Sequence, residues 1–158
     1  MTSPIDSSLL ARVQRIALAL AGAALVGVAA IQAWQVFARY VMNDSPGWTE
    51  PLALLLLVTA MSFAAASAVR SRSHFAFNVL VESVAPRIAR VLRALADVVV
   101  AIVGGTLAVG GAHLLVDGWD VPMAGAPLPQ GLPFLPLSIG GALMALFALE
   151  RLFTKGKP

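Results

Sequence analysis

Long uncharged stretches alternate with short polar segments along the chain. Four such stretches cover residues 16–38, 51–69, 98–116 and 121–149. A bilayer core about 30 Å thick is crossed by roughly 20 helical residues, so each stretch is long enough to span it. Residues 117–133 contain four prolines and three glycines, which preclude a regular element through most of that segment, so Pro133 or Pro136 can start the fourth helix. The pattern predicts an all-α integral membrane protein, a single membrane domain over residues 1–158, with four transmembrane helices at about 16–38, 51–69, 96–116 and 133–150.

The start of the chain admits two interpretations. Residues 1–11 resemble a loosely ordered lead-in, and Arg12 and Arg15 then precede the first stretch as basic residues precede a signal-peptide core. Small residues at 28–30 would suit a cleavage site. The 23 uncharged residues of the first stretch exceed the roughly 7–15 of a signal core, so we interpret it as an uncleaved membrane helix.

Composition and charge narrow the class and the orientation. Of the 158 residues, 59% are hydrophobic and 12% are charged, which excludes an ordinary soluble domain. Ten of the eleven Lys and Arg residues lie in the N-terminal flank, the connection between the second and third stretches, and the C-terminal tail; the exception is Arg39. The positive-inside rule therefore predicts that both termini are cytoplasmic. Basic residues confined to such flanks do not form a nucleic-acid surface, and the lack of cysteine excludes disulfides and thiolate metal sites.

Polar and aromatic residues gather where the first two stretches reach the outer boundary. Arg39 and Tyr40 close the first stretch, Trp48 suits an interfacial aromatic belt, and Glu50 lies at the positive end of the second helix dipole. Two roles remain open for them: stabilising the helix ends at the membrane boundary, or contacting a partner protein. The candidate partner-interface residues are Arg39, Tyr40, Trp48 and Glu50.

The connection between the second and third stretches predicts an interfacial amphipathic helix over about 74–84. His74, Asn78 and Glu82 recur every four positions and make a narrow polar stripe on an otherwise apolar segment. Pro86 then opens a cytoplasmic extension of the third helix, in which Asp97 is expected to pair with Arg93 one turn earlier. The extension also carries the arginines expected to contact anionic headgroups, which are Arg87, Arg90 and Arg93.

Small residues recur at a spacing of four in every stretch, which suits close helix packing within the chain or against a partner. The stripes are Ala19/Ala23/Gly27, Ala60/Ala64/Ala68, Gly104/Ala108/Ala112 and Gly141/Ala145.

The interiors of the stretches carry no ionisable residue, whereas coupled transporters place such groups inside the membrane. We therefore expect no ion or substrate path in this chain. The deepest polar residues are expected to hydrogen-bond to their own helices; they are Thr59, Ser62, Thr106 and Ser138.

Enzyme and cofactor chemistry find no support in the motifs. His74 and His113 fall near opposite membrane boundaries, roughly 30 Å apart, and cannot ligate one haem iron. No nucleophile elbow, zincin motif, P-loop or dinucleotide fingerprint occurs in a useful context. We predict that the chain is not an enzyme and has no catalytic residue, cofactor, metal site or substrate-binding residue of its own.

With these residues placed, the chain resembles the small membrane subunit of the tripartite ATP-independent periplasmic (TRAP) transporters, the DctQ-like family. The likeness is carried by Arg39-Tyr40, Asn43, Trp48-Thr49-Glu50, the charged break at 70–72 and His74, in that order. Weaker likeness continues in Pro86-Arg87, Asp97, Gly131-Leu132-Pro133, Pro136, Gly140 and Leu143. Acids that commonly occupy two positions in the family are replaced by Pro51 and Asn78, which puts any role of those acids in doubt here.

The resemblance implies a task and partners. Such subunits bind a large permease that carries the sodium and organic-anion sites, while a periplasmic binding protein delivers a carboxylate; sodium coupling is thus expected in the permease. The implied location is the bacterial inner membrane, where the chain would also contact lipid. The alternative is a membrane anchor or assembly subunit of another inner-membrane complex, and a neighbouring gene for a large permease or a binding protein would discriminate between the two.

Overall fold

Four long helices make up the computed structural model, which describes residues 4–71 and 86–154. They are α1 (Pro4–Tyr40), α2 (Thr49–Ser71), α4 (Pro86–Asp117) and α5 (Phe134–Thr154). Each contains a segment long and apolar enough to cross a membrane, and the described ranges hold no β-strand beyond an isolated bridge between Pro122 and Pro129. Within residues 4–71 and 86–154, the prediction of an all-α chain with four helices long and apolar enough to span a membrane is confirmed.

The first helix begins earlier than the sequence indicates. α1 starts at Pro4, so residues 4–11 are helical and the expectation of a loosely ordered lead-in is wrong for them. A proline is favoured in the first turn because its missing N–H would have no partner there. The amphipathic helix expected at 74–84, with His74, Asn78 and Glu82, lies outside the described residues.

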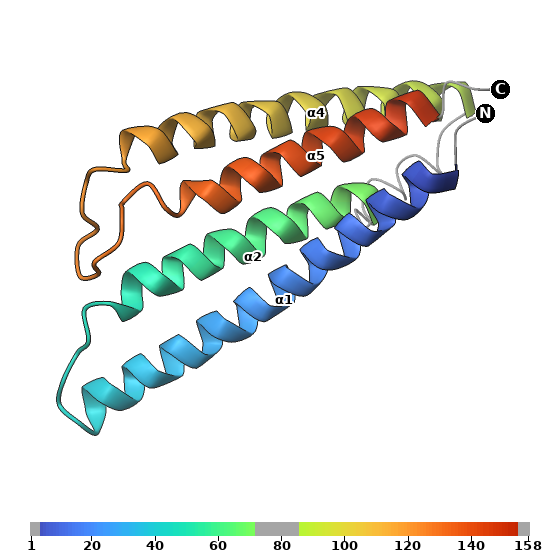
Figure 1. The fold of residues 1–158 in the computed structure, drawn as a ribbon. Helices are drawn as coiled ribbons and strands as arrows, with labels where there is room; N and C mark the ends of the chain where they lie inside the picture. The colour runs from blue at the N-terminus through green and yellow to red at the C-terminus, as the bar shows by residue number, and fades with distance from the viewer. Residues whose placement is uncertain (1–3, 72–85, 155–158) are drawn as a thin grey trace.

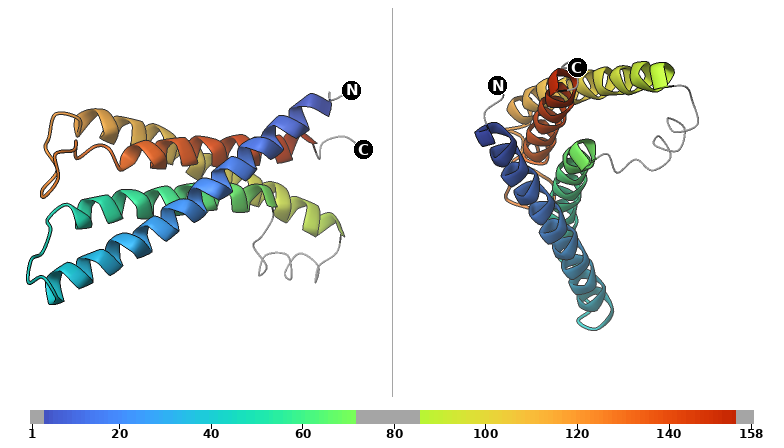
Figure 2. Two further views of the ribbon diagram at one scale, coloured as in Figure 1. Left: turned by 60° about the horizontal axis from the view of Figure 1, so that its bottom comes forward. Right: turned by 90° about the vertical axis from the view of Figure 1, so that its right-hand side faces the viewer.

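The helices form a row of two antiparallel hairpins. Figure 1 shows α1 beside α2 and α4 beside α5, with α2 and α5 as the neighbours in the middle. In Figure 2 (left), α1 runs obliquely across the central pair. In the most apolar segments of α2 and α5, 33% and 28% of the residues are buried, but only 17% and 11% in those of α1 and α4. The two flanking helices therefore present most of their apolar surface to the surroundings.

Small residues bring α4 and α5 into backbone contact. A Cβ added at Gly104 would lie 2.7 Å from the backbone nitrogen of Ala145, and one added at Gly141 would lie 2.7 Å from that of Ala108. Ser138 also donates a hydrogen bond from Oγ to the carbonyl oxygen of Ala108, at 2.7 Å. The stripes at 104/108 and 141/145 thus pack against each other, as small residues between membrane helices allow.

The stripe expected in α1 faces α2 at only one of its three positions, because a Cβ added at Gly27 would lie 2.9 Å from Cδ1 of Leu56. Ala19 and Ala23 are exposed, whereas the buried face consists of Ala17, Ala21 and Ala24. In a stretch so rich in alanine, several sets share the spacing of four, and only the neighbouring helix decides which set is buried.

The two hairpins meet through α2 and α5. A Cβ at Gly140 would lie 2.6 Å from Cβ of Ser62, so the helices touch at this level. Towards the termini, the fully buried Phe147 packs in one cluster with Ala66 and Val69. This central contact joins the hairpins into one unit.

The hydroxyl groups inside the helices donate hydrogen bonds either to their own helix or to a neighbouring one. Thr59 donates to the carbonyl oxygen of Leu55 at 2.7 Å, and Thr106 donates to that of Ile102 at 3.0 Å, as predicted for hydroxyls that bond to their own helix. Ser138 differs, because its acceptor lies on α4. Its hydroxyl is therefore an interhelical contact that the sequence did not reveal.

Candidate functional site

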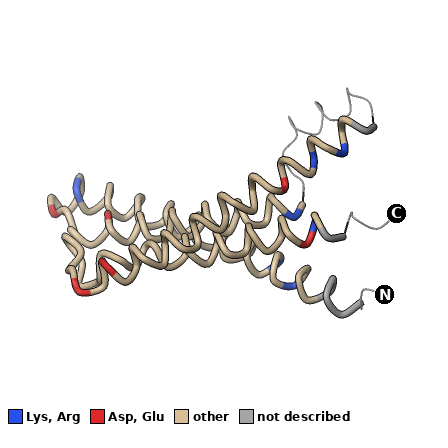
Figure 3. The backbone as a smooth tube through the Cα atoms, turned by 90° about the horizontal axis from the view of Figure 1, so that it is seen from above, with Lys and Arg blue, Asp and Glu red and all other residues tan. Residues whose placement is uncertain are grey.

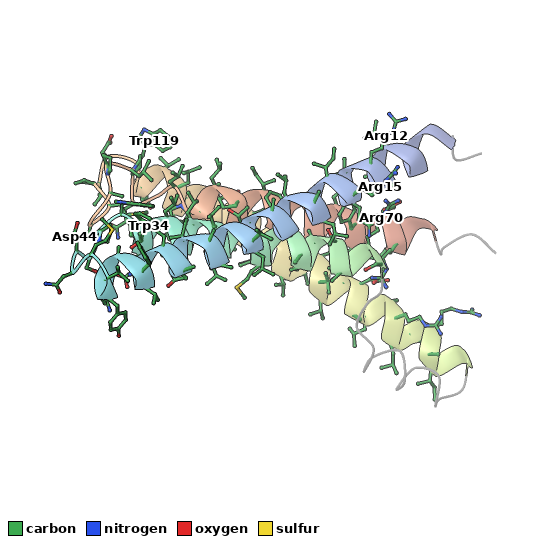
Figure 4. The ribbon with its side chains drawn as sticks, turned by 90° about the horizontal axis from the view of Figure 1, so that it is seen from below. Arg12, Arg15, Trp34, Asp44, Arg70 and Trp119 are labelled. Carbon is green, nitrogen blue, oxygen red and sulfur yellow. The ribbon has the colours of Figure 1, made fainter. Side chains whose placement is uncertain are left out.

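The polar residues of the described chain gather at the two ends of the molecule. Figure 3 shows charged residues at both ends and none in the middle of the helices. We call the end with the connections 41–48 and 118–133 the loop end and the opposite one the terminus end. In Figure 4, Trp34, Asp44 and Trp119 lie at the loop end, and Arg12, Arg15 and Arg70 lie towards the terminus end. This is the distribution of a chain that crosses a bilayer with polar groups at each boundary.

A defined turn joins α1 to α2 at the loop end. Asn43 has a φ of 54°, the left-handed region that asparagine tolerates better than most residues. The N–H of Asp44 donates to the carbonyl oxygen of Ala38 at 3.1 Å. The fully buried Thr49 donates from its hydroxyl to the carbonyl oxygen of Pro46 at 2.8 Å. These contacts hold the start of α2 against the end of α1.

The turn brings three of the four candidate partner-interface residues together. Arg39, Tyr40 and Glu50 line one pocket of about 360 Å³, which we call the polar pocket. Its wall also includes Gln32 and Gln35, which the sequence did not single out; they lie on α1 within two turns of Arg39. The fourth candidate, Trp48, is exposed and does not line the pocket.

A larger groove opens on the other side of Glu50, between α2, α5 and the connection 118–133. Its volume is about 780 Å³, and apolar side chains form most of its wall. We call it the outer groove; its wall includes Glu50, Leu54, Val58, Met123, Gln130 and Leu137. Glu50 is therefore shared between a polar and an apolar hollow.

A polar network occupies the terminus end, and Arg70 of α2 lies at its centre. Its Nε is 3.3 Å from Oε2 of Glu150 on α5, and its Nη1 donates to Oε1 of Gln14 on α1 at 3.4 Å. The guanidinium carbon lies 5.7 Å from the ring centroid of Phe147. One side chain of α2 thus contacts two other helices, α1 through Gln14 and α5 through Glu150 and Phe147.

Arg151 extends this network to α4. Its Nη2 lies 3.0 Å from Oδ1 of Asp97, and its Nη1 donates to the carbonyl oxygen of Val69 at 2.6 Å. Asp97 is 2% exposed. From the sequence, Asp97 is expected to pair with Arg93 one turn away, but its carboxylate lies against Arg151 across the row. The network therefore ties all four helices together, which no local pattern indicates.

The arginines expected to contact headgroups belong to a part of α4 that precedes this network. Arg90 is exposed and Arg93 is half-buried. Asp97 lies level with Arg151 on α5, so the first eleven residues of α4, from Pro86, come before that contact. At 1.5 Å per residue they extend for about 16 Å.

No metal-binding chemistry is apparent in the described part of the chain. Residues 4–71 and 86–154 contain no group of three or more His, Asp or Glu side chains that could hold a metal ion. His113 is exposed on α4. The arrangement is suited to packing and to contact with lipid or protein.

Comparison with known proteins agrees with this picture. No curated protein sequence matches the chain. The family model described as "Tripartite ATP-independent periplasmic transporters, DctQ component" matches residues 28–156, from the middle of α1 past the end of α5.

Proposed function

The chain belongs to the DctQ family of tripartite ATP-independent periplasmic transporter components, and from this premise we propose that it is the small membrane subunit that braces a large permease. The proposed process is sodium-coupled uptake of an organic acid that a periplasmic binding protein delivers. The observation that carries the proposal is the family match over most of the chain. The absence of charged residues from the middle of the described helices supports a bracing role, since a coupled carrier needs polar groups there.

The proposed location is the bacterial inner membrane, with both termini in the cytoplasm. The terminus end carries Arg12, Arg15 and Arg70, whereas the loop end carries Arg39. Because basic residues favour the cytoplasmic side, the loop end would face the periplasm. There it would be accessible to a binding protein.

We place the contact with the partner proteins at the polar pocket. Arg39 is exposed, donates to Oγ of Ser45 at 3.3 Å, and is not in ion-pair contact with any acid of the described residues. Together with Tyr40 and Glu50 it offers a cation, a phenol and a carboxylate in one hollow. Trp48 would anchor the same end at the headgroup level.

We propose that the residues at the terminus end keep the assembly from tilting in the membrane while the permease moves. The segment 74–84 would lie flat in the interface with His74, Asn78 and Glu82 towards water. Arg87, Arg90 and Arg93 would contact anionic headgroups, each worth about 1 kcal/mol. No cofactor is proposed for this chain, and the sodium sites are assigned to the permease.

Reconstitution tests the proposal. Liposomes that contain only this chain should show no sodium-dependent carboxylate uptake above empty vesicles. Uptake should appear when a large permease of the same transporter class and a binding protein are added, and should fall when this chain is omitted. Uptake by the chain alone, or full uptake without it, would refute the bracing role.

A further inference from the structure

We propose that the outer groove binds a phospholipid whose headgroup carries a primary ammonium, with one acyl chain in the groove and Glu50 as the counter-ion. This goes beyond the bracing role, and it uses the side of Glu50 that faces away from the polar pocket. It commits to a lipid as occupant, and a helix of a partner protein is an outcome of the test.

The groove has the size of a ligand site. The close contact between Ser62 and Gly140 holds α2 and α5 together, and the groove lies on the loop-end side of that contact. Its volume of about 780 Å³ is within the roughly 300–1,000 Å³ of small-molecule sites. In a membrane such a hollow does not hold water, because most of its wall is apolar.

The wall changes from polar to apolar along α2. Glu50, Leu54 and Val58 are spaced by four and follow one face of the helix. From Glu50 to Val58 the helix rises about 12 Å. Glu50 is two residues from Trp48, a residue type that sits at headgroup level, so the apolar part of the groove points into the hydrocarbon.

The outer end of the groove is closed to a helix that would continue past the membrane boundary. Met123 and Gln130 belong to the connection 118–133, which lines the groove where a transmembrane helix would have to continue. A lipid meets no such obstacle, because its chain ends in a headgroup at this level. The amide of Gln130 can donate to a lipid phosphate or carbonyl oxygen.

The charge at the rim selects the headgroup. Glu50 is exposed, and within residues 4–71 and 86–154 no Lys or Arg lies within ion-pair distance of it. A carboxylate at this position attracts an ammonium and repels an anionic headgroup. A primary ammonium also donates hydrogen bonds to the carboxylate, which a trimethylated one cannot do.

Native mass spectrometry of the full chain tests the proposal. The chain, released from detergent, is incubated with phosphatidylethanolamine or phosphatidylglycerol of the same acyl chains, and the retained lipid is counted. We expect preferential retention of phosphatidylethanolamine. Glu50→Gln should reduce that retention about fivefold, the change expected for one exposed charge at the headgroup layer. Leu54→Trp should reduce retention of both lipids by filling the groove.

A matched variant separates the groove from its surroundings. Leu57→Trp places the same bulk on an exposed position of α2 outside the groove. This variant should retain lipid as the unmodified chain does. Equal retention of the two lipids, or retention unaffected by Glu50→Gln and Leu54→Trp, would overturn the proposal. So would a single cysteine at Leu54 that crosslinks to the permease in the assembled complex, since the groove would then hold a protein; the chain has no other cysteine. The lipid-retention results use this chain alone, so they do not depend on whether the bracing role is correct.

Discussion

Replacing Asp97 with asparagine probes the polar network at the terminus end with almost no change in volume. The substitution removes the charge that faces Arg151 at 3.0 Å. The guanidinium keeps its hydrogen bond to the carbonyl oxygen of Val69, at 2.6 Å, and Oδ1 of the asparagine can still accept a hydrogen bond, so the charge of the pair is what is lost. The effect on the free energy of unfolding therefore reports what the interhelical ion pair contributes.

Burial sets the size of the effect. The Asp97 side chain is 4% exposed and that of Arg151 is 19% exposed. Hydrogen bonds to charged groups contribute about 1.5–3 kcal/mol, and breaking a fully buried pair costs about 3–5 kcal/mol. Since Arg151 keeps the Val69 carbonyl, we expect Asp97→Asn to destabilise the chain by about 2 kcal/mol. Glu150 is 25% exposed opposite Arg70, so Glu150→Gln should cost less, about 1 kcal/mol or below.

The free energy of unfolding of both variants is measured by adding SDS to the full chain in mixed micelles. Unfolding is followed by the loss of helicity and by crosslinking between the hairpins. Arg151→Gln and the double variant complete a thermodynamic cycle, in which a coupling energy of at least about 0.5 kcal/mol is expected for contacting residues. A variant with the two charges exchanged, Asp97→Arg with Arg151→Asp, should recover part of the stability that the single variants lose.

Two outcomes would refute this reasoning. If Asp97→Asn and Glu150→Gln had equal effects, burial would not decide the strength of these pairs. If the cycle gave no coupling, the contact between Asp97 and Arg151 would contribute nothing to stability, and the four helices would be held by apolar and small-residue packing alone.

Three further predictions follow from the packing, the orientation and the polar pocket. Gly104→Ala should destabilise the α4–α5 hairpin by about 1–3 kcal/mol in SDS unfolding, because its Cβ meets backbone at 2.7 Å, whereas the adjacent Gly105→Ala, with nothing within 4 Å, should be neutral or stabilising. Reporter fusions at Gly125 and Lys157 should give periplasmic and cytoplasmic signals respectively, and a periplasmic signal at Lys157 would contradict the orientation. Arg39→Ala should lower uptake by the assembled transporter without affecting membrane insertion. Unchanged uptake would mean that Arg39 only contacts water and headgroups at the membrane boundary.

The sequence predicts the helices well because transfer into lipid depends on composition over about 20 residues. It does not predict which face of a helix is buried. Ala17 and Ala19 are equally suitable in isolation, and only the position of α2 makes the first buried and the second exposed. The sequence does predict that the loop-end residues lie together, because Arg39 and Glu50 are close along the chain, and both line the polar pocket.

The terminus-end network could not be predicted in the same way. Its contacts join residues 53 to 82 positions apart, such as Gln14 with Ser67 and Arg151 with Val69. Asp97 has a basic residue one turn away in the sequence, so a local pair is the natural expectation. The partner across the row becomes evident only when the hairpins are assembled. The outer groove likewise depends on how the connection 118–133 lies beside α2.

The helices of this chain stand in a row, and a row has almost no interior. Residues such as Val26, Val91 and Val109 meet the surroundings and need only be apolar, so many substitutions there are interchangeable. Within the chain, packing restricts the side chain strictly only where backbones touch, as at Gly104 and Gly141, or where charges meet across the row. Away from any surface that contacts a partner, the row keeps its shape through a few such points and tolerates apolar exchange elsewhere.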